Sequence, residues 1–429
     1  MSLRYFYRLA LAFFRRFKAL FALGIIIGFF SFLALAILIP SLSATHVRQG
    51  MVGRFTADNI PYEITTKLSR GLTTVDDNGN VNPGLAKSWE SPDGCKTWIF
   101  NLQENIIWID GKKLVANDIN YIFNDAVVEI IDEKTIKYNL DSPFSAFPII
   151  VSRPLFKKGL IGTSDWKIKT LSLSAGYLQK LIIVDKKGNK ITYKFYPTED
   201  RLRLGLKLGE IDLIENIQDP EPFDLWRTVD VKKVISYNNF VGIFLNTEDE
   251  KLADKSVRQS LAYAIDKNEF EGVRALGPIS PNSWGYNPQV KQYLKDLEKT
   301  KDLKDTKIVL STLPNLLKVA EKIKIDWKEA GVETEIEVVS SIPEKYQAFL
   351  ATVDIPKDPD QYSLWHSTQV STNISKYKNP RIDKLLEDGR TELDQETRKK
   401  IYLDFQRFLV EDVPAIFLYH PTLYTISRK

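Results

Sequence analysis

The chain has 429 residues, of which 44% are hydrophobic and 27% are charged, so it is long enough for two or three domains. Its formal net charge is only +4, and basic residues alternate with acidic ones along most of the sequence, which argues against a nucleic-acid partner. The single cysteine, Cys95, excludes an intramolecular disulfide, a cysteine-ligated metal cluster and a lipid anchor placed after an apolar leader.

The N-terminus combines a basic flank with a long apolar run. Residues 1–18 carry only basic charged side chains, and residues 19–39 carry no charge. At about 1.5 Å per residue this run spans roughly 30 Å, the thickness of a hydrocarbon core. The pattern predicts a cytoplasmic segment over 1–18, a transmembrane helix over 19–40 that acts as a signal anchor, and an extracytoplasmic remainder. A cleaved secretory signal is the alternative, because residues 41–44 are mostly small.

The next part of the chain is typical of short strands joined by turns. Residues 97–102 are rich in β-forming side chains, and Asp, Asn and Gly cluster between such runs. Residues 181–184 and 191–195 predict a hairpin around an Asp-Lys-Lys-Gly-Asn turn. The tryptophans of this region fit core and hairpin packing better than ligand stacking; they are Trp89, Trp98 and Trp108.

Helical periodicity begins after Asn246. Asp254 is placed to cap a helix, and residues 308–312 predict a strand. An amphipathic helix ending at Gly331 follows, and residues 332–339 alternate apolar side chains with glutamates. This order predicts a βαβ unit of a parallel sheet with its last strand at an edge. A final helix capped near Asp394 precedes a closing strand at 415–418.

Several motifs in this order resemble the peptide- and nickel-type solute-binding proteins of ABC importers, known as family 5. The resemblance covers roughly residues 68–423. It is carried by LSRGL (68–72), NPGLAKSWE (82–90), WIDGKKLVAND (108–118), LGEID (208–212), VRQSLAYAID (257–266), DPD (358–360), YKNP (377–380) and VPAI (413–416). Arg258, in the fifth motif, is expected to pair with a neighbouring carboxylate.

The resemblance implies a fold and a function. The expected fold is α/β, a two-lobed periplasmic-binding-protein-like fold of type II in the peptide-binding cluster, after one N-terminal transmembrane helix. Lobe 1 would comprise residues 45–238 and 354–429, lobe 2 residues 239–353, and the ligand would lie between the lobes. The expected partners are a peptide or small-solute ligand, the permease and ATPase subunits of an ABC importer, and the lipid bilayer through residues 19–40.

The resemblance also indicates where a ligand would bind. In peptide-binding members an aspartate shortly before the acidic-proline step meets the α-ammonium of the peptide. Asp354 is the nearest match, and Asp358 is the second choice of register. Trp365 and Asn246 complete the candidate ligand contacts. His366, beside Trp365, is either a ligand or metal contact or a polar residue on an ordinary loop.

Signatures of catalysis are missing from the sequence. The 3 histidines are scattered, and neither a nucleophile elbow nor a phosphate loop nor a dinucleotide fingerprint occurs. We therefore expect no catalytic residue, no metal and no cofactor. The alternative to an importer subunit is a ligand sensor or a membrane-anchored scaffold built on the same fold.

Overall fold

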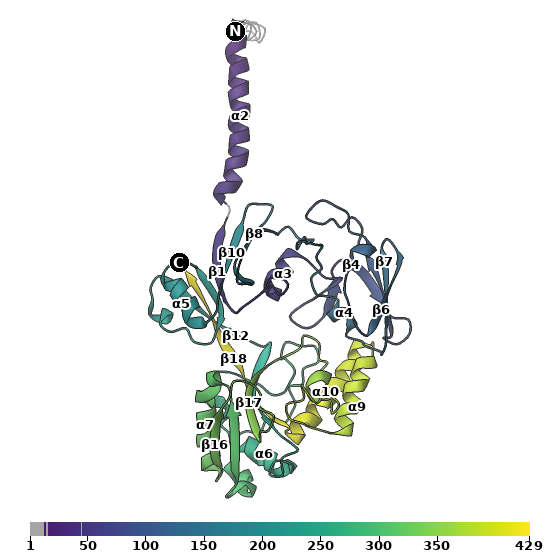
Figure 1. Ribbon diagram of the computed structural model, residues 1–429, viewed down its shortest axis with the longest axis vertical. Helices are drawn as coiled ribbons and strands as arrows, with labels where there is room; N and C mark the ends of the chain where they lie inside the picture. Colours follow the sequence, from purple (N-terminus) through teal and green to yellow (C-terminus); the bar gives the residue numbers. More distant parts are fainter. Residues whose placement is uncertain (1–12, 14–15, 44) are drawn as a thin grey trace, which may run out of the picture. The chain divides into compact units, whose positions relative to one another are not determined.

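The computed structural model describes residues 13, 16–43 and 45–429. Helix α2 spans Lys18–Ser43 (Figure 1). The described part of the chain contains no helix that is both long enough and apolar enough to cross a membrane. The transmembrane helix predicted over 19–40 is thus not supported by the structure. The structure describes the side chains of only part of that segment. Most of the predicted cytoplasmic segment, 1–18, also lies outside the described residues.

The chain forms two compact units, each built from two stretches of sequence. The first unit comprises Met1–Ile60 and Asp165–Asp212. Its strand β1 pairs in parallel with β10, and β8, β9 and β10 form an antiparallel meander, so the predicted hairpin is confirmed. The bounds are β1 (His46–Val52), β8 (Lys167–Ser174), β9 (Tyr177–Val184), β10 (Lys190–Tyr196) and α5 (Glu199–Lys207).

The LGEID motif closes this first unit. The guanidinium of Arg48 donates two hydrogen bonds to the Asp212 carboxylate, at 2.7 and 2.5 Å, and a third to the carbonyl of Gly209 at 2.7 Å. A guanidinium matches a carboxylate in this two-pronged geometry. The motif therefore fixes the end of α5 against β1 through one arginine.

The second unit comprises Pro61–Ser164 and Leu213–Lys429. Its first stretch contains a four-stranded antiparallel sheet in the order β4-β5-β7-β6 and a β2-β3 pair. Trp98 and Trp108 are buried in the core of this sheet, and half-buried Trp89 stacks on Phe100, which confirms the packing interpretation. The bounds are α3 (Tyr62–Leu68), β2 (Thr73–Val75), β3 (Val81–Pro83), β4 (Ala86–Glu90), β5 (Thr97–Leu102), β6 (Ala126–Asp132), β7 (Thr135–Leu140) and α4 (Phe147–Ile150).

A mixed sheet in the order β16-β15-β17-β13-β18 organises the second stretch, and β11, β12 and β14 also pair with β18. β15 and β16 are parallel and joined by α7, which lies along them in Figure 1, so the predicted βαβ unit and its edge strand are confirmed. The bounds are β11 (Leu213–Ile217), β12 (Val229–Ile235), β13 (Asn239–Leu245), β14 (Gly272–Arg274), β15 (Lys307–Thr312), α7 (Leu317–Glu329), β16 (Glu333–Val338), β17 (Ala348–Asp354) and β18 (Ala415–Arg428).

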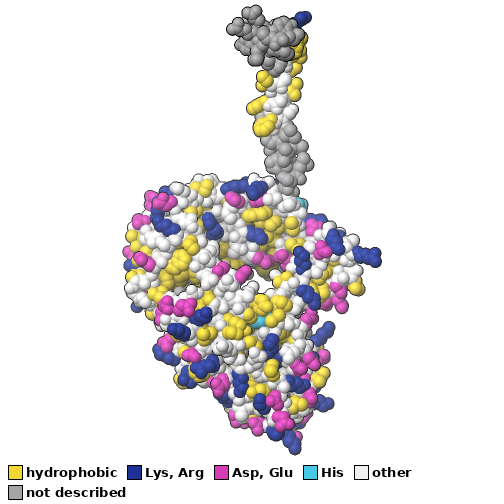
Figure 2. Space-filling model, turned by 180° about the vertical axis from the view of Figure 1, so that it is seen from behind, with side chains coloured by type: hydrophobic (Ala, Val, Ile, Leu, Met, Phe, Trp, Pro, Cys, Tyr) yellow, Lys and Arg dark blue, Asp and Glu magenta, His cyan; other side chains and the backbone are white. Residues whose placement is uncertain are grey.

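Four further helices pack on this sheet or against one another. The predicted N-caps are confirmed: Asp254 accepts a hydrogen bond from the Ser256 N–H, and Asp394 from the Thr397 N–H. On the face shown in Figure 2, Lys and Arg side chains are interspersed with Asp and Glu, as the sequence predicts. The bounds are α6 (Lys255–Tyr263), α8 (Tyr362–Trp365), α9 (Pro380–Thr391) and α10 (Gln395–Asp412).

Candidate functional site

Strands β13 and β17 position the candidate site, because they pair antiparallel with Asn239 opposite Asp354 and Val241 opposite Thr352. Side chains two residues apart on a strand share a face, and directly paired residues point the same way. These four side chains therefore lie on one face of the sheet. Tyr419 of β18 pairs with Val241 on its other side and extends that face.

A cavity of about 440 Å³ opens on this face within the second unit. Its volume lies in the range of pockets that hold small ligands. Its walls come from the loop after β11, the loop before β14, the start of α7 and the middle of β18. The lining residues are Gln218, Asp219, Pro220, Glu221, Val241, Glu269, Phe270, Glu271, Asn315, Leu316, Lys318, Val319, Lys322, Tyr419, Pro421, Thr422 and Tyr424.

Aromatic rings and polar groups share the wall of the cavity. Tyr419 stacks on Phe270 with ring centroids 5.5 Å apart and an interplanar angle of 11°. The Tyr424 hydroxyl donates a 2.6 Å hydrogen bond to the Glu271 carboxylate. This bond, together with burial, raises the pKa of Tyr424 to about 12. The arrangement offers stacking surface and a hydrogen-bonding rim to a bound molecule.

The Tyr419 hydroxyl is a polar group of this wall that is available to a ligand. Tyr419 is 8% exposed, and its hydroxyl has no hydrogen-bond partner in the described part of the chain. Burial raises the pKa of Tyr419 to about 12, with a contribution from the negative charge of Glu271. The hydroxyl therefore stays protonated at neutral pH and is free to donate or accept a hydrogen bond.

Asp354, the first candidate anchor, ends β17 and is exposed. Over the described residues, its carboxylate forms neither a hydrogen bond nor an ion pair. Two buried oxygens on the same face also lack a partner there, Oδ1 of Asn239 and Oγ1 of Thr352. Buried polar groups are normally hydrogen-bonded, so these atoms mark a place where a ligand or water would bind. The ligand role of Asp354 stays a prediction.

Asp358, the alternative anchor, already forms an ion pair within the protein. It is 6% exposed, and Arg398 of α10 donates to both of its carboxylate oxygens at 3.1 and 2.8 Å. The two groups form a buried ion pair that links the loop after β17 to α10. A ligand ammonium would have to compete with this guanidinium.

The other two candidate contacts lie in structural positions. Trp365 is 1% exposed and stacks on Phe244 at 5.9 Å, and its indole N–H has no partner among the described residues. Asn246 is buried; its amide donates to the carbonyl of Tyr346, and its oxygen accepts from the Glu248 N–H. Neither residue lines the cavity. Their ligand roles stay predictions.

His366 is a buried residue directly after α8. Its ring stacks on Tyr362 at 4.0 Å, and its Nδ1 lies 2.8 Å from the Thr368 hydroxyl. Its Nε2 lies 3.4 Å from a carboxylate oxygen of Glu387. The described residues contain no cluster of three or more His, Cys, Asp or Glu side chains arranged to hold a metal ion.

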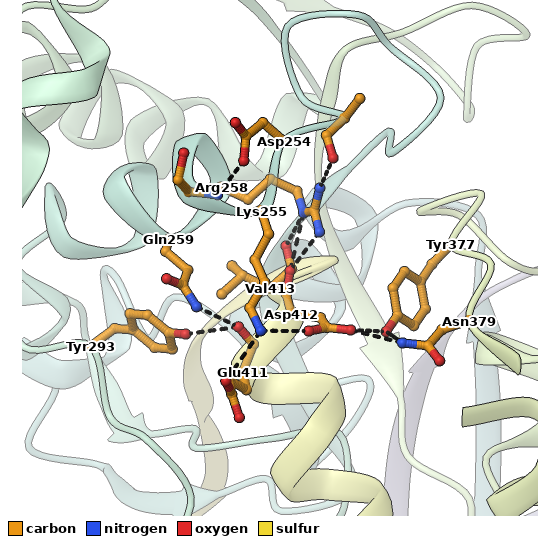
Figure 3. A network of polar contacts seen from close by, with 12 residues as sticks. Asp254, Lys255, Arg258, Gln259, Tyr293, Tyr377, Asn379, Glu411, Asp412 and Val413 are labelled. Carbon is orange, nitrogen blue, oxygen red and sulfur yellow. Dashed lines mark hydrogen bonds and ion pairs between the residues drawn. The ribbon is translucent and has the colours of Figure 1, made fainter. Parts of the chain in front are cut away.

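Arg258 differs from its expected role. Its guanidinium donates to main-chain carbonyls instead of a carboxylate: those of Leu252 and Ala253 at 2.8 and 2.7 Å, and those of Asp412 and Val413 at 2.8 to 3.1 Å. Figure 3 shows this guanidinium at the C-terminus of α10, with the Asp412 side chain turned towards Tyr377 and Asn379 instead. The carbonyls at a helix end lack intrahelical donors, so Arg258 satisfies them.

The sequence interpretation missed the residues of the cavity wall. Phe270 comes from the loop before β14. Tyr419 and Tyr424 come from a strand that sequence reasoning ended at 418, whereas β18 continues to Arg428. A signal was present, because β-forming residues continue after Pro421. Pro421 lacks a backbone N–H for the sheet, and prolines commonly stand at the ends of strands.

Comparisons with known proteins support the resemblance to family 5. The family model described as bacterial extracellular solute-binding proteins, family 5 Middle, matches residues 184–373. The dipeptide-binding protein of Escherichia coli is 24% identical over 470 residues, which cover 87% of this chain and 86% of that protein. The oligopeptide-binding protein AppA of Bacillus subtilis is 24% identical over 459 residues, which cover 86% of this chain and 83% of that protein.

A solved structure shows the same fold. The crystal structure of NikZ from Campylobacter jejuni, in complex with Ni(L-His), has a TM-score of 0.73 and 21% identity, and the match covers 90% of this chain and 94% of NikZ. The fold is thus the mixed α/β, two-lobed fold of the periplasmic binding proteins, as the motifs predicted. The chain is thus similar to family 5 of the bacterial extracellular solute-binding proteins, both in the region that the family model matches and over most of its length in the curated relatives.

Proposed function

We propose that this chain is the extracytoplasmic substrate-binding subunit of an ABC importer and that its cargo is a peptide or a similar solute. The observation that carries the proposal is the similarity to di- and oligopeptide-binding proteins over more than four fifths of the chain. The family consists of binding proteins of transporters, and the cavity offers stacking and hydrogen-bonding surface. On this proposal the protein binds and delivers its cargo without chemical change and is not an enzyme.

We further propose that the ligand occupies the cavity above β13 and β18, with Asp354 at its margin as the anchor of a peptide α-ammonium. The unpaired Asp354 carboxylate shares a sheet face with Val241 and Tyr419, which line the cavity. Asn239 and Thr352 add two unsatisfied oxygens to that face. Asp358 is the weaker choice because Arg398 already neutralises it.

The attachment to the membrane is a separate part of the proposal. The uncharged run at 19–39 behind a basic flank supports a signal anchor that keeps the chain on the outer face of the cell membrane.

The lobe boundaries 45–238, 239–353 and 354–429 are also part of the proposed architecture. They are supported by β13 and β17, which lie side by side where the chain would enter and leave the second lobe.

Ligand-induced stabilisation tests the binding function. Purified protein would be screened by thermal unfolding against di- to pentapeptides, sugars and nickel chelates. A ligand that binds only the folded state adds about 2.7 kcal/mol to the free energy of unfolding at a hundredfold excess over Kd. We expect this with peptides that carry a free amine and a smaller effect with their N-acetylated forms. Failure of every ligand to shift the unfolding temperature would favour the sensor or scaffold alternative.

A further inference from the structure

A second, much smaller cavity lies between α6, β14 and the junction of α10 with β18. Its volume of about 10 Å³ is close to the space that one water-sized sphere requires. Three of its lining side chains are cationic and none is acidic. The lining residues are Ala262, Lys267, Arg274, Leu276, Lys291, Tyr293, Val410, Val413, Ala415, Ile416 and Phe417.

Lys267 is the most deeply buried of the three cations, at 6% exposure. Its ammonium donates to three main-chain carbonyls, those of Ala262, Ile265 and Tyr293. No carboxylate of the described residues bonds to it. Burial and the positive charge of Arg274 together lower the pKa of Lys267 to about 7.

Arg274, like Lys267, donates its side-chain hydrogen bonds to main-chain carbonyls. One terminal nitrogen, Nη1, donates to the carbonyls of Ala275, Phe417 and Leu418, and Nη2 donates to that of Gln292 at 3.1 Å. A guanidinium carries five N–H groups, and the one on Nε has no acceptor among the described residues. Burial lowers the pKa of Arg274 to about 10.

Lys291 supplies the third cation, from an exposed position. Its ammonium lies 4.7 Å from the ring centroid of Tyr293 and forms no hydrogen bond or ion pair within the described chain. The carboxylates of Asp266 and Asp326 act on Lys267 through their charge but bond to other groups. Asp266 accepts from the Asn268 N–H, and Asp326 bonds to Lys295.

A counter-charge is therefore missing from this cavity. Charges removed from water are costly unless an opposite charge is near, and carbonyl dipoles alone replace only part of the lost hydration. We propose that this cavity binds a monatomic anion, chloride in physiological media, held by Arg274 and Lys291 beside the Lys267 ammonium. The small volume excludes phosphate, carboxylate ligands and peptides. The site is separate from the cavity proposed for the transported ligand.

Bromide, a heavier halide of similar size, makes the site directly visible. Crystals of the protein would be grown in sodium bromide, and anomalous difference density would be calculated near the bromine absorption edge. We expect a peak in the cavity between the side chains of Arg274 and Lys291. Bromide found only at exposed lysines, with an empty or water-filled cavity, would overturn the proposal.

A solution measurement separates a specific site from general salt effects. Thermal unfolding would be compared in sodium chloride and sodium gluconate at equal ionic strength. At a tenfold excess of chloride over Kd, the ratio of folded to unfolded protein rises about elevenfold. Lys291→Met should lose most of this difference, whereas Lys301→Met, an exposed lysine outside the cavity, should keep it. An equal response of all three proteins to the two salts would contradict the site.

Discussion

Asp354 and Asp358 show how strongly the surroundings of a residue decide its use. Asp358 directly precedes Pro359, and Asp354 lies four residues earlier. From the sequence, either residue could be the amine anchor. Asp354 is exposed and unpaired among the described residues, whereas Asp358 is buried against Arg398. The two residues should therefore respond differently to the same substitution.

Asp354→Asn should weaken the binding of a free-amine peptide by at least about a hundredfold, or about 2.7 kcal/mol, because the peptide ammonium, once enclosed by binding, would lose its counter-charge. The free energy of unfolding should stay nearly unchanged, since the side chain is exposed and the substitution nearly isosteric. Isothermal titration with free-amine and N-acetylated forms of one peptide measures the effect. Parental affinity in the variant would place the amine anchor elsewhere.

Asp358→Asn is the matched comparison. It leaves the Arg398 guanidinium buried without its partner, which costs on the order of 3–5 kcal/mol of stability. Urea unfolding should show this loss, and peptide binding at low temperature should remain. A stable variant that no longer binds peptide would instead make Asp358 the anchor.

Lys267 makes stability depend on pH. Its pKa is lowered from 10.5 to about 7 in the folded protein, so between these values the unfolded chain holds a proton that the folded chain lacks. The free energy of unfolding therefore rises with pH in this window, by up to about 1.4 kcal/mol per unit. Below pH 7 both states are protonated and the contribution is constant.

The comparison of Lys267→Met with the parent isolates this contribution. Unfolding by urea would be measured from pH 7 to pH 9.5 in sodium gluconate, so that no halide supports the ammonium. The parent should gain stability relative to the variant as the pH rises. Parallel pH curves for the two proteins would mean that Lys267 keeps an ordinary pKa.

At the scale of elements, the Arg258 side chain of α6 supports the C-terminus of α10 by donating to its last carbonyls. Arg258→Met would leave the carbonyls of Asp412 and Val413 without their donor and remove the link to the loop before α6. We expect a loss of about 3 kcal/mol in the free energy of unfolding. Asp394→Ala, which removes only the N-cap of the same helix, should cost about 1 kcal/mol. Equal losses from the two substitutions would show that the Arg258 network adds little to the end of the helix.

At the scale of the whole molecule, the signal-anchor proposal predicts attachment to the membrane. Protease added to intact cells should digest everything after about residue 45, and the full chain should remain in the membrane fraction after an alkaline wash. A mature protein that begins near residue 45 and washes off freely would show that the N-terminal run is a cleaved signal. Binding of ligand is unaffected by either outcome, so the two proposals fail independently.

The sequence by itself predicted those features that depend on neighbours along the chain. The caps at Asp254 and Asp394, the β9–β10 hairpin and the parallel βαβ unit follow from periodicity and turn chemistry within a few residues. The order of short motifs predicted the resemblance to family 5 and the fold.

The tertiary structure alone decided which polar groups are occupied and where a ligand has room. Arg398 is 40 residues from the aspartate it neutralises, and the Arg258 guanidinium lies 154 residues from the carbonyl of Asp412. The cavity wall joins a loop after β11, the start of α7 and the middle of β18. Burial and pairing arise from such distant contacts, and no local pattern records them. From the sequence, Asp354 and Asp358 were therefore alternative anchors. Only the fold showed that Asp354 is exposed and that Asp358 is paired with Arg398.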